Sequence, residues 1–511
     1  MLLPSLFSKL NNAESALSRV IPCRPRVTDS SSATTFGQIR RWIEACDTHH
    51  KCWTGPKPLP TRVLDVGESS KYIRLVETQR KNGRFIALSH CWGQENVQKT
   101  TRGNYRSQIE GIELRYLSET FRDAVQTARA LAIRYLWIDS LCIIQDDEDD
   151  WKREASMMAE VYANTFVTLA ATSAPNGTHG CFAPWEVRRQ SERVYSDEES
   201  CTGAVLSDSI VPWLETRGDD DRGIAYLSKG PNAILNKQSL IVHWGWLPPS
   251  TSDSPKYRGV GTYGIHIDPV KDQPLNLRGW TFQERILSPR ILHFAVDQIY
   301  WQCRRLFEAE DGSRYSTKFV NVDRLVQRQQ LPPIGASVFQ SDPLFQKLPP
   351  SSLGRIGKLS GGWLEAVELY SLRQLTYAKD KLPAMAGLAS YVRQKTNESY
   401  HAGLWGNHIW ENLFWAVRGT AERTAGDNTC AAEYHAPSWS WASLDAPVTF
   451  IPPDADKIVA ELIIVYTKHS GPYLHGAVSG GFIKIWVRYS CLNSFQLICL
   501  LTPYFNRHHC D

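Results

Sequence analysis

The central part of the sequence predicts an α/β fold in which helices flank a parallel sheet. Three short apolar runs, at residues 85–89, 135–138 and 165–171, end abruptly at small or polar residues, as buried parallel strands do. Two longer segments between them, at residues 117–132 and about 150–162, carry apolar residues at helical spacing. The order strand, helix, strand, helix, strand is typical of a parallel sheet with right-handed crossovers.

The first predicted helix has the clearest periodicity, with apolar side chains at i, i+3, i+4 and i+7 from Phe121 onward. Ser118 or Thr120 can cap its first turn. The second helix follows an acidic run at residues 146–150, whose negative charge complements the positive end of the helix dipole. Because the run lacks the central glycine and final glutamate of an EF-hand, we expect it to be structural.

Further elements are predicted towards the C-terminus. Residues 292–301 have the character of another strand, and residues 363–372 and 384–395 that of helices. Residues 438–443 alternate serine or alanine with two tryptophans, which predicts a strand with both indole rings on one face. Core packing is the simplest role for these rings.

Composition restricts the class of protein. A chain of 511 residues is too long for one core, and 42% hydrophobic residues with 18 Trp and 20 Tyr exclude global disorder. The net charge of +4 gives no reason to expect a nucleic-acid partner. The apolar stretch 483–501 is interrupted by Lys484 and Arg488, so we expect no membrane span. The apolar start lacks a basic segment and contains Pro4, so we expect no signal peptide and a cytoplasmic location.

Twelve cysteines are scattered along the chain and are expected to be reduced, buried thiols. A short predicted helix at residues 36–45 leads into Cys46, His49, His50 and Cys52, which together suggest zinc. A structural zinc site needs four ligands, however, and no second cluster with suitable spacing appears. Buried cysteines with surface histidines are therefore the favoured interpretation, and no metal is expected.

Three segments carry the candidate functional residues. Ser89, Trp92 and Gly93 follow one predicted strand and Asp139 follows the next, so they should border one crevice at the carboxyl edge of the sheet. Asp139 can bind a ligand hydroxyl or fix the following turn through backbone N–H groups, and the second role is slightly favoured. Gly93 suits a conformation that other residues avoid. The third segment, residues 278–285, offers one carboxylate beside an aromatic ring, and together the three suggest a nucleotide-sized site.

These segments resemble the heterokaryon incompatibility (HET) domain of filamentous fungi. Its hallmarks are a strand ending in a Ser-x-Cys-Trp-Gly-like turn, an Ile-Asp-Ser-x-Cys-Ile strand and a Trp-Thr-x-Gln-Glu motif, and all three occur here in the family's order. The resemblance covers about residues 85–294. It implies a role in nonself recognition and programmed cell death, with self-association and other incompatibility proteins as partners.

A weaker resemblance links the third segment to Toll/interleukin-1 receptor (TIR) domains, some of which cleave NAD with a glutamate. Glu284 stands in that glutamate's place, although Thr281 replaces a cysteine and a long insertion enlarges the spacing. Because nicotinamide leaves as a neutral group, one carboxylate that offsets the developing positive charge can suffice. Trp280 or Trp92 could stack on the ring of NAD, which would be a substrate, with no cofactor. Glu284 beside Arg285 is also explained by a structural ion pair.

The predicted organisation begins with an N-terminal adapter (1–84) and a TIR-like HET domain (85–300) that contains a polar insertion at about 188–272. A linker (301–355), a mixed α+β domain (356–490) and an unassigned tail (491–511) follow. Two hypotheses remain open for the function. One is an enzyme that hydrolyses NAD with Glu284, and the other is a non-enzymatic module that signals through homotypic assembly.

Overall fold

We analysed a computed structural model of the chain. It describes residues 29–67, 71–93, 98–182, 213–214, 225–226, 268–312, 314–315, 322–325, 360–418, 434–451, 460–470 and 475–487. The predicted insertion lies almost wholly outside these residues, as do much of the predicted linker and the tail at 491–511.

The chain divides into two compact units, and each contains segments that are distant in sequence. The first comprises Met1–Cys142, Thr165–Leu275 and Pro289–Lys318. The second comprises Ile143–Asn164, Asn276–Ser288 and Phe319–Asp511. The domain limits expected from the sequence stay a prediction, because this division follows contacts and not the order of the chain.

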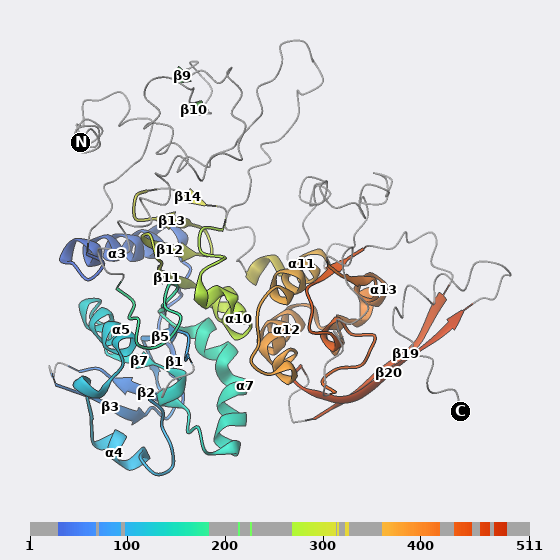
Figure 1. The fold of residues 1–511 in the computed structure, drawn as a ribbon, viewed down its shortest axis with the longest axis horizontal. Helices are drawn as coiled ribbons and strands as arrows, with labels where there is room; N and C mark the ends of the chain where they lie inside the picture. Colours follow the sequence, from blue (N-terminus) through green and yellow to red (C-terminus); the bar gives the residue numbers. More distant parts are fainter. Residues whose placement is uncertain are drawn as a thin grey trace, which may run out of the picture. The chain divides into compact units, whose positions relative to one another are not determined.

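A ten-stranded mixed sheet forms the first unit (Figure 1). Its strand order is β14 (Arg314–Tyr315), β13 (Phe307–Ala309), β12 (Ile299–Cys303), β11 (Arg290–Phe294), β8 (Val167–Ala170), β5 (Phe85–Ser89), β7 (Tyr135–Trp137), β2 (Arg62–Asp65), β3 (Tyr72–Glu77) and β6 (Ile112–Glu113). The unit also contains α3 (Ala33–Ala45), the π-helical turn η1 (Cys46–His50), α4 (Tyr105–Glu110), α5 (Glu119–Ala130), α6 (Asp139–Cys142) and the pairs β1 (Lys57–Pro58) with β4 (Asn82–Gly83) and β9 (Trp213–Leu214) with β10 (Ala225–Tyr226).

The centre of this sheet is parallel, as predicted. β8 pairs in parallel with both β5 and β11, and β5 pairs in parallel with β7. Numbered along the chain, these four strands stand in the order 2-1-3-4, which is that of flavodoxin-like doubly wound sheets. The sheet as a whole is mixed, because antiparallel strands extend the parallel centre on both sides: β2, β3 and β6 beyond β7, and β12 to β14 beyond β11.

Local sequence explains the central elements. All five residues of β5 are buried, as its unbroken apolar run predicts. In α5 the buried face includes Phe121, Val125 and Ala128, and the hydroxyl of Ser118 accepts a hydrogen bond from the Phe121 N–H at 3.4 Å. The predicted periodicity and the Ser118 cap are therefore confirmed.

The strand expected at residues 292–301 is instead a hairpin. β11 and β12 run antiparallel, and the Ala295 N–H donates to the Gln298 carbonyl at 3.2 Å to close the turn between them. Both strands are buried throughout, so the apolar pattern continues across the turn and conceals it.

In the second unit, α7 (Glu148–Asn164), α10 (Trp280–Leu287) and α12 (Pro383–Thr396) pack against one another. The other elements are α11 (Ser360–Ser371), α13 (Ile409–Leu413), and the antiparallel pairs β15 (Tyr400–His401) with β16 (Leu404–Trp405), β17 (Trp415–Val417) with β18 (Val448–Phe450) and β19 (Ala460–His469) with β20 (Val478–Val487). The helices expected at 363–372 and 384–395 are confirmed as α11 and α12.

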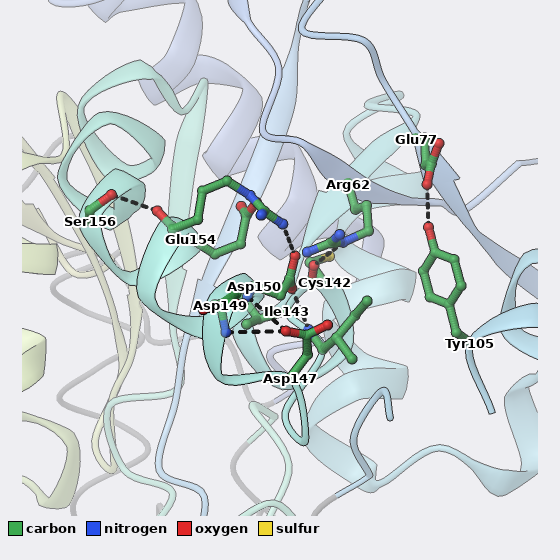
Figure 2. A network of polar contacts seen from close by, with 12 residues as sticks. Arg62, Glu77, Tyr105, Cys142, Ile143, Asp147, Asp149, Asp150, Glu154 and Ser156 are labelled. Carbon is green, nitrogen blue, oxygen red and sulfur yellow. Dashed lines mark hydrogen bonds and ion pairs between the residues drawn. The ribbon is translucent and has the colours of Figure 1, made fainter. Parts of the chain in front are cut away.

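Two predictions within this unit have opposite outcomes. The acidic run does serve the start of α7: the Asp147 carboxylate accepts the N–H groups of Asp149 and Asp150 at 3.1 and 3.0 Å (Figure 2). The strand expected at 438–443 is wrong. Those residues form a turn and the 3-10 helix Trp441–Ser443, in which the Ala442 N–H donates to the Ser440 hydroxyl at 3.1 Å.

Candidate functional site

The carboxyl edge of the parallel strands contains a topological switch point between β5 and β8. From β5 the chain goes to β7 on one side, and β8 then pairs on the other side. Ser89, the last residue of β5, is buried opposite Ala170, and its carbonyl accepts the Ala171 N–H at 3.0 Å. Ligands of doubly wound folds bind beyond such a point, which makes the turns after these strands the candidate site.

Trp92 and Asp139 lie together at this edge. The Trp92 indole N–H donates to the Oδ2 atom of Asp139 at 2.8 Å. The Oδ1 atom accepts the Ser140 N–H at 2.7 Å, and Nδ1 of His90 lies 3.8 Å away from it. The structure thus brings together the turns that follow β5 and β7, as the sequence predicted.

Asp139 has the structural role that the sequence slightly favoured, and its binding of a ligand hydroxyl stays a prediction. Its bond to the Ser140 N–H fixes the start of α6, and its bond to Trp92 ties two turns together. Its side chain nevertheless keeps 21% of its surface exposed. A carboxylate held by two donors is fixed in direction, so it can orient a ligand hydroxyl at its open edge.

Gly93 requires glycine for two reasons. Its φ of +76° lies in the left-handed region, where other residues are strained. A Cβ atom at Gly93 would also lie 2.6 Å from Cβ of Asn176, in the loop after β8. The two loops at the switch point therefore touch, and the special conformation expected for Gly93 is confirmed.

His90 and Cys91 do not form a nucleophile pair. Nδ1 of His90 faces Asp139, and its ring meets Phe121 edge-on with the ring centres 5.1 Å apart. Cys91 instead joins a buried apolar cluster with Ala170, Leu275 and Ile291. Cysteine catalysis at this turn, which the alternation of an extended chain argued against, has no geometric support.

The third motif lies on α10, in the second unit, and its side chains are used in packing. The Trp280 N–H donates to Asp380 at 3.2 Å. Burial raises the pKa of Asp380, and the hydrogen bond from Trp280 acts in the opposite direction. The side-chain oxygen of Gln283 accepts the Gly387 N–H at 3.2 Å. Glu284 is only 6% exposed, so its carboxylate is a buried acid.

Asn176 contributes to the candidate site at the end of β5, although the sequence analysis did not identify it. Its side-chain oxygen accepts the N–H and the hydroxyl of Thr178 at 3.0 and 2.8 Å, which shapes the loop that meets Gly93. A turn signal was present in the sequence, because the Asn-Gly pair at 176–177 follows the strand expected at 165–171 by only a few residues. Asp380 was also missed, and no local pattern connects it with Trp280.

Comparison with known proteins agrees with these motifs. Residues 85–284 match the family model described as "Heterokaryon incompatibility protein (HET)". The chain carries a HET domain. The matched segment begins at β5 and ends at Glu284, so the HET domain includes segments of both compact units. No curated protein and no solved structure matches the chain. Among the helices that the structure describes, none is long and apolar enough to cross a bilayer.

Proposed function

We propose that this HET-domain protein acts in fungal nonself recognition and programmed cell death. The family match carries the proposal, supported by the order of the three motifs and by the convergence of two of them at Trp92 and Asp139. Self-association and contact with other incompatibility proteins, in the cytoplasm, complete the proposed role.

The chemistry proposed for the HET domain is hydrolysis of NAD at the bond between nicotinamide and ribose. Glu284 would offset the positive charge that develops on the ribose, as the resemblance to TIR domains implies. The doubly wound order of the central strands supports a nucleotide as the ligand class. Trp92 and Asp139 would contact the base and a ribose hydroxyl, and Ser89 and Gly93 would leave room for them. Trp280 would contribute a second aromatic surface.

The burial of Glu284 favours a second candidate function. A carboxylate that is 6% exposed, in a motif whose Trp280 and Gln283 make packing contacts, suits a framework that signals by homotypic assembly. In this case the motifs would be needed for the fold and the assembly interface, and no turnover would occur.

NAD consumption by the purified full-length protein distinguishes the two functions. The test compares the wild type with Glu284→Gln, which keeps the shape and removes the charge, and with Glu154→Gln, a buried acid of α7 outside the motif. Loss of NAD with the wild type and Glu154→Gln, but not with a folded Glu284→Gln, supports the enzyme. Absence of turnover by wild-type protein that light scattering shows to be assembled refutes the enzyme and supports the framework.

A further inference from the structure

Three buried thiols converge in the first unit, away from the motifs described above. The Sγ atoms of Cys46, Cys52 and Cys303 all lie within 4.8 Å of one another, and no disulfide joins them. Nδ1 of His50 lies 3.4 Å from Sγ of Cys303. From the sequence, buried cysteines were preferred to zinc because no second cluster was visible. The fold supplies the missing ligand from Cys303, which is 253 residues beyond His50.

Two short turns build this arrangement. α3 continues into η1, a π-helical turn that the Lys51 N–H closes on the Cys46 carbonyl at 2.7 Å. Lys51 then adopts a φ of 51°, which reverses the chain so that Cys52 returns to the same side as Cys46. Cys303 ends β12, and its N–H donates to the Leu306 carbonyl at 2.7 Å in the following turn. Both segments are held by backbone hydrogen bonds, which is how a closed metal site is preorganised.

The donor spacing suits a tetrahedral zinc ion. With Zn–S bonds of about 2.3 Å and a Zn–N bond of about 2.0 Å, neighbouring sulfurs would be about 3.8 Å apart and a sulfur and nitrogen about 3.5 Å apart. The three thiols lie within 4.8 Å of one another, and Nδ1 of His50 lies 3.4 Å from the Cys303 sulfur, close to the sulfur–nitrogen separation of such a site. Three cysteines and one histidine are a common ligand set of structural zinc sites.

A buried arginine supplies the matching charge. Zn²⁺ with three thiolates and a neutral imidazole carries a net charge of −1, which is costly to bury alone. Arg290 is fully buried and pairs with Cys303 in the register of β11 and β12. It forms an ion pair with Asp47, the residue after Cys46, but its Nε and Nη1 atoms have no hydrogen-bond partner among the described residues. These N–H groups are suited to donate to thiolate sulfurs, as residues around metal sites often do.

We propose that Cys46, His50, Cys52 and Cys303 bind one structural Zn²⁺ ion, with Arg290 balancing its charge. The ion joins the segment after α3 to the end of β12. It reinforces a contact that already exists there, since Trp42 stacks on Trp301 with ring centres 6.3 Å apart and donates to Glu308 at 3.0 Å. The site anchors the N-terminal segment to the sheet, and its role is independent of NAD hydrolysis.

Zinc content of the full-length protein, purified without chelator, tests the proposal. We expect about one zinc per chain in the wild type and below about one tenth in Cys303→Ser. His50→Ala should bind zinc more weakly against a competing chelator, whereas the adjacent exposed His49→Ala should not. Cys181→Ser, which removes a buried thiol outside the cluster, should retain full zinc content.

Cobalt provides a measurement that does not depend on the folding of a variant. Wild-type protein stripped of zinc and given Co²⁺ should show the thiolate charge-transfer and tetrahedral ligand-field absorption of a Cys-rich site, and added Zn²⁺ should abolish both. Wild-type protein that is folded but neither contains zinc nor takes up Co²⁺ would overturn the proposal. A disulfide within the cluster in freshly purified protein, or full zinc content in Cys303→Ser, would do the same.

Discussion

Replacement of Gly93 by alanine tests whether the turn after β5 is fixed by the loop after β8. Two separate costs are expected. Placing an L-residue at a φ of +76° costs about 1–2 kcal/mol. The new Cβ would lie 2.6 Å from Cβ of Asn176, where ordinary contacts are 3.4–4 Å, and such overpacking typically costs about 1–3 kcal/mol. The free energy of unfolding should therefore fall by about 2–5 kcal/mol.

Gly55 provides the matched control, because its φ is +107° and an added Cβ meets nothing within 4 Å. Gly55→Ala should thus report the backbone cost alone. Urea unfolding followed by far-UV circular dichroism gives both free energies. Because Asn176→Gly also removes the bonds to Thr178, the double variant Gly93→Ala/Asn176→Gly is compared with Asn176→Gly alone, and in that background the steric part of the Gly93→Ala cost should be absent. The reasoning is refuted if Gly93→Ala costs no more than Gly55→Ala, or if the second substitution recovers nothing.

Three further predictions have defined outcomes. Trp92→Phe removes the hydrogen bond to the Asp139 carboxylate, so urea unfolding should show a loss of about 1.5–3 kcal/mol, and an unchanged free energy would contradict that role. Burial lowers the pKa of Lys381 to about 8 from its ordinary 10.5, so the unfolded state binds more protons between these values and stability should rise with pH there. The rise should reach at most about 3 kcal/mol and be absent in Lys381→Met. Gly387→Ala places a Cβ 2.4 Å from an alanine of α7 and should lower the melting temperature, whereas Gly37→Ala, in an open position of α3, should raise it slightly.

The central sheet could be predicted because burial and local pattern agree there. The run at 85–89 is buried on both faces, and the 3.6-residue period of α5 has a polar face towards solvent. The hairpin of β11 and β12 could not be found in this way. Its turn at Ala295–Gln298 has only a short polar interruption between two fully buried strands. The strand prediction at 438–443 was wrong because the local pattern was misleading. The alternation of these residues suits a strand, but the Ser440 hydroxyl caps a 3-10 turn and Trp441 is buried by tertiary packing.

The part of the candidate site that lies at the carboxyl ends of β5 and β7 could be predicted from the sequence. The carboxyl-end rule places the turns after β5 and β7 together, and Trp92 does meet Asp139. The environment of α10 depends instead on partners about one hundred residues away, such as Asp380 and Gly387. The thiol cluster likewise needs Cys303, which only the sheet brings to the N-terminal segment. Contacts between distant segments leave no local pattern in a single sequence.

Residues of the three HET motifs can serve the fold or the chemistry, and isosteric substitutions can distinguish these two roles. Asp139 orients two turns through a hydrogen bond from Trp92 and another from a backbone N–H, so Asp139→Asn retains an acceptor but weakens both bonds. Glu284 is buried, where the neutral amide of Glu284→Gln costs less desolvation than a carboxylate. If Glu284 serves only the fold, this substitution should lower the free energy of unfolding, because it weakens the contacts of the carboxylate in the core. If the charge serves catalysis, the same substitution should abolish turnover while the protein stays folded, which is the expected trade-off between stability and function at an active site.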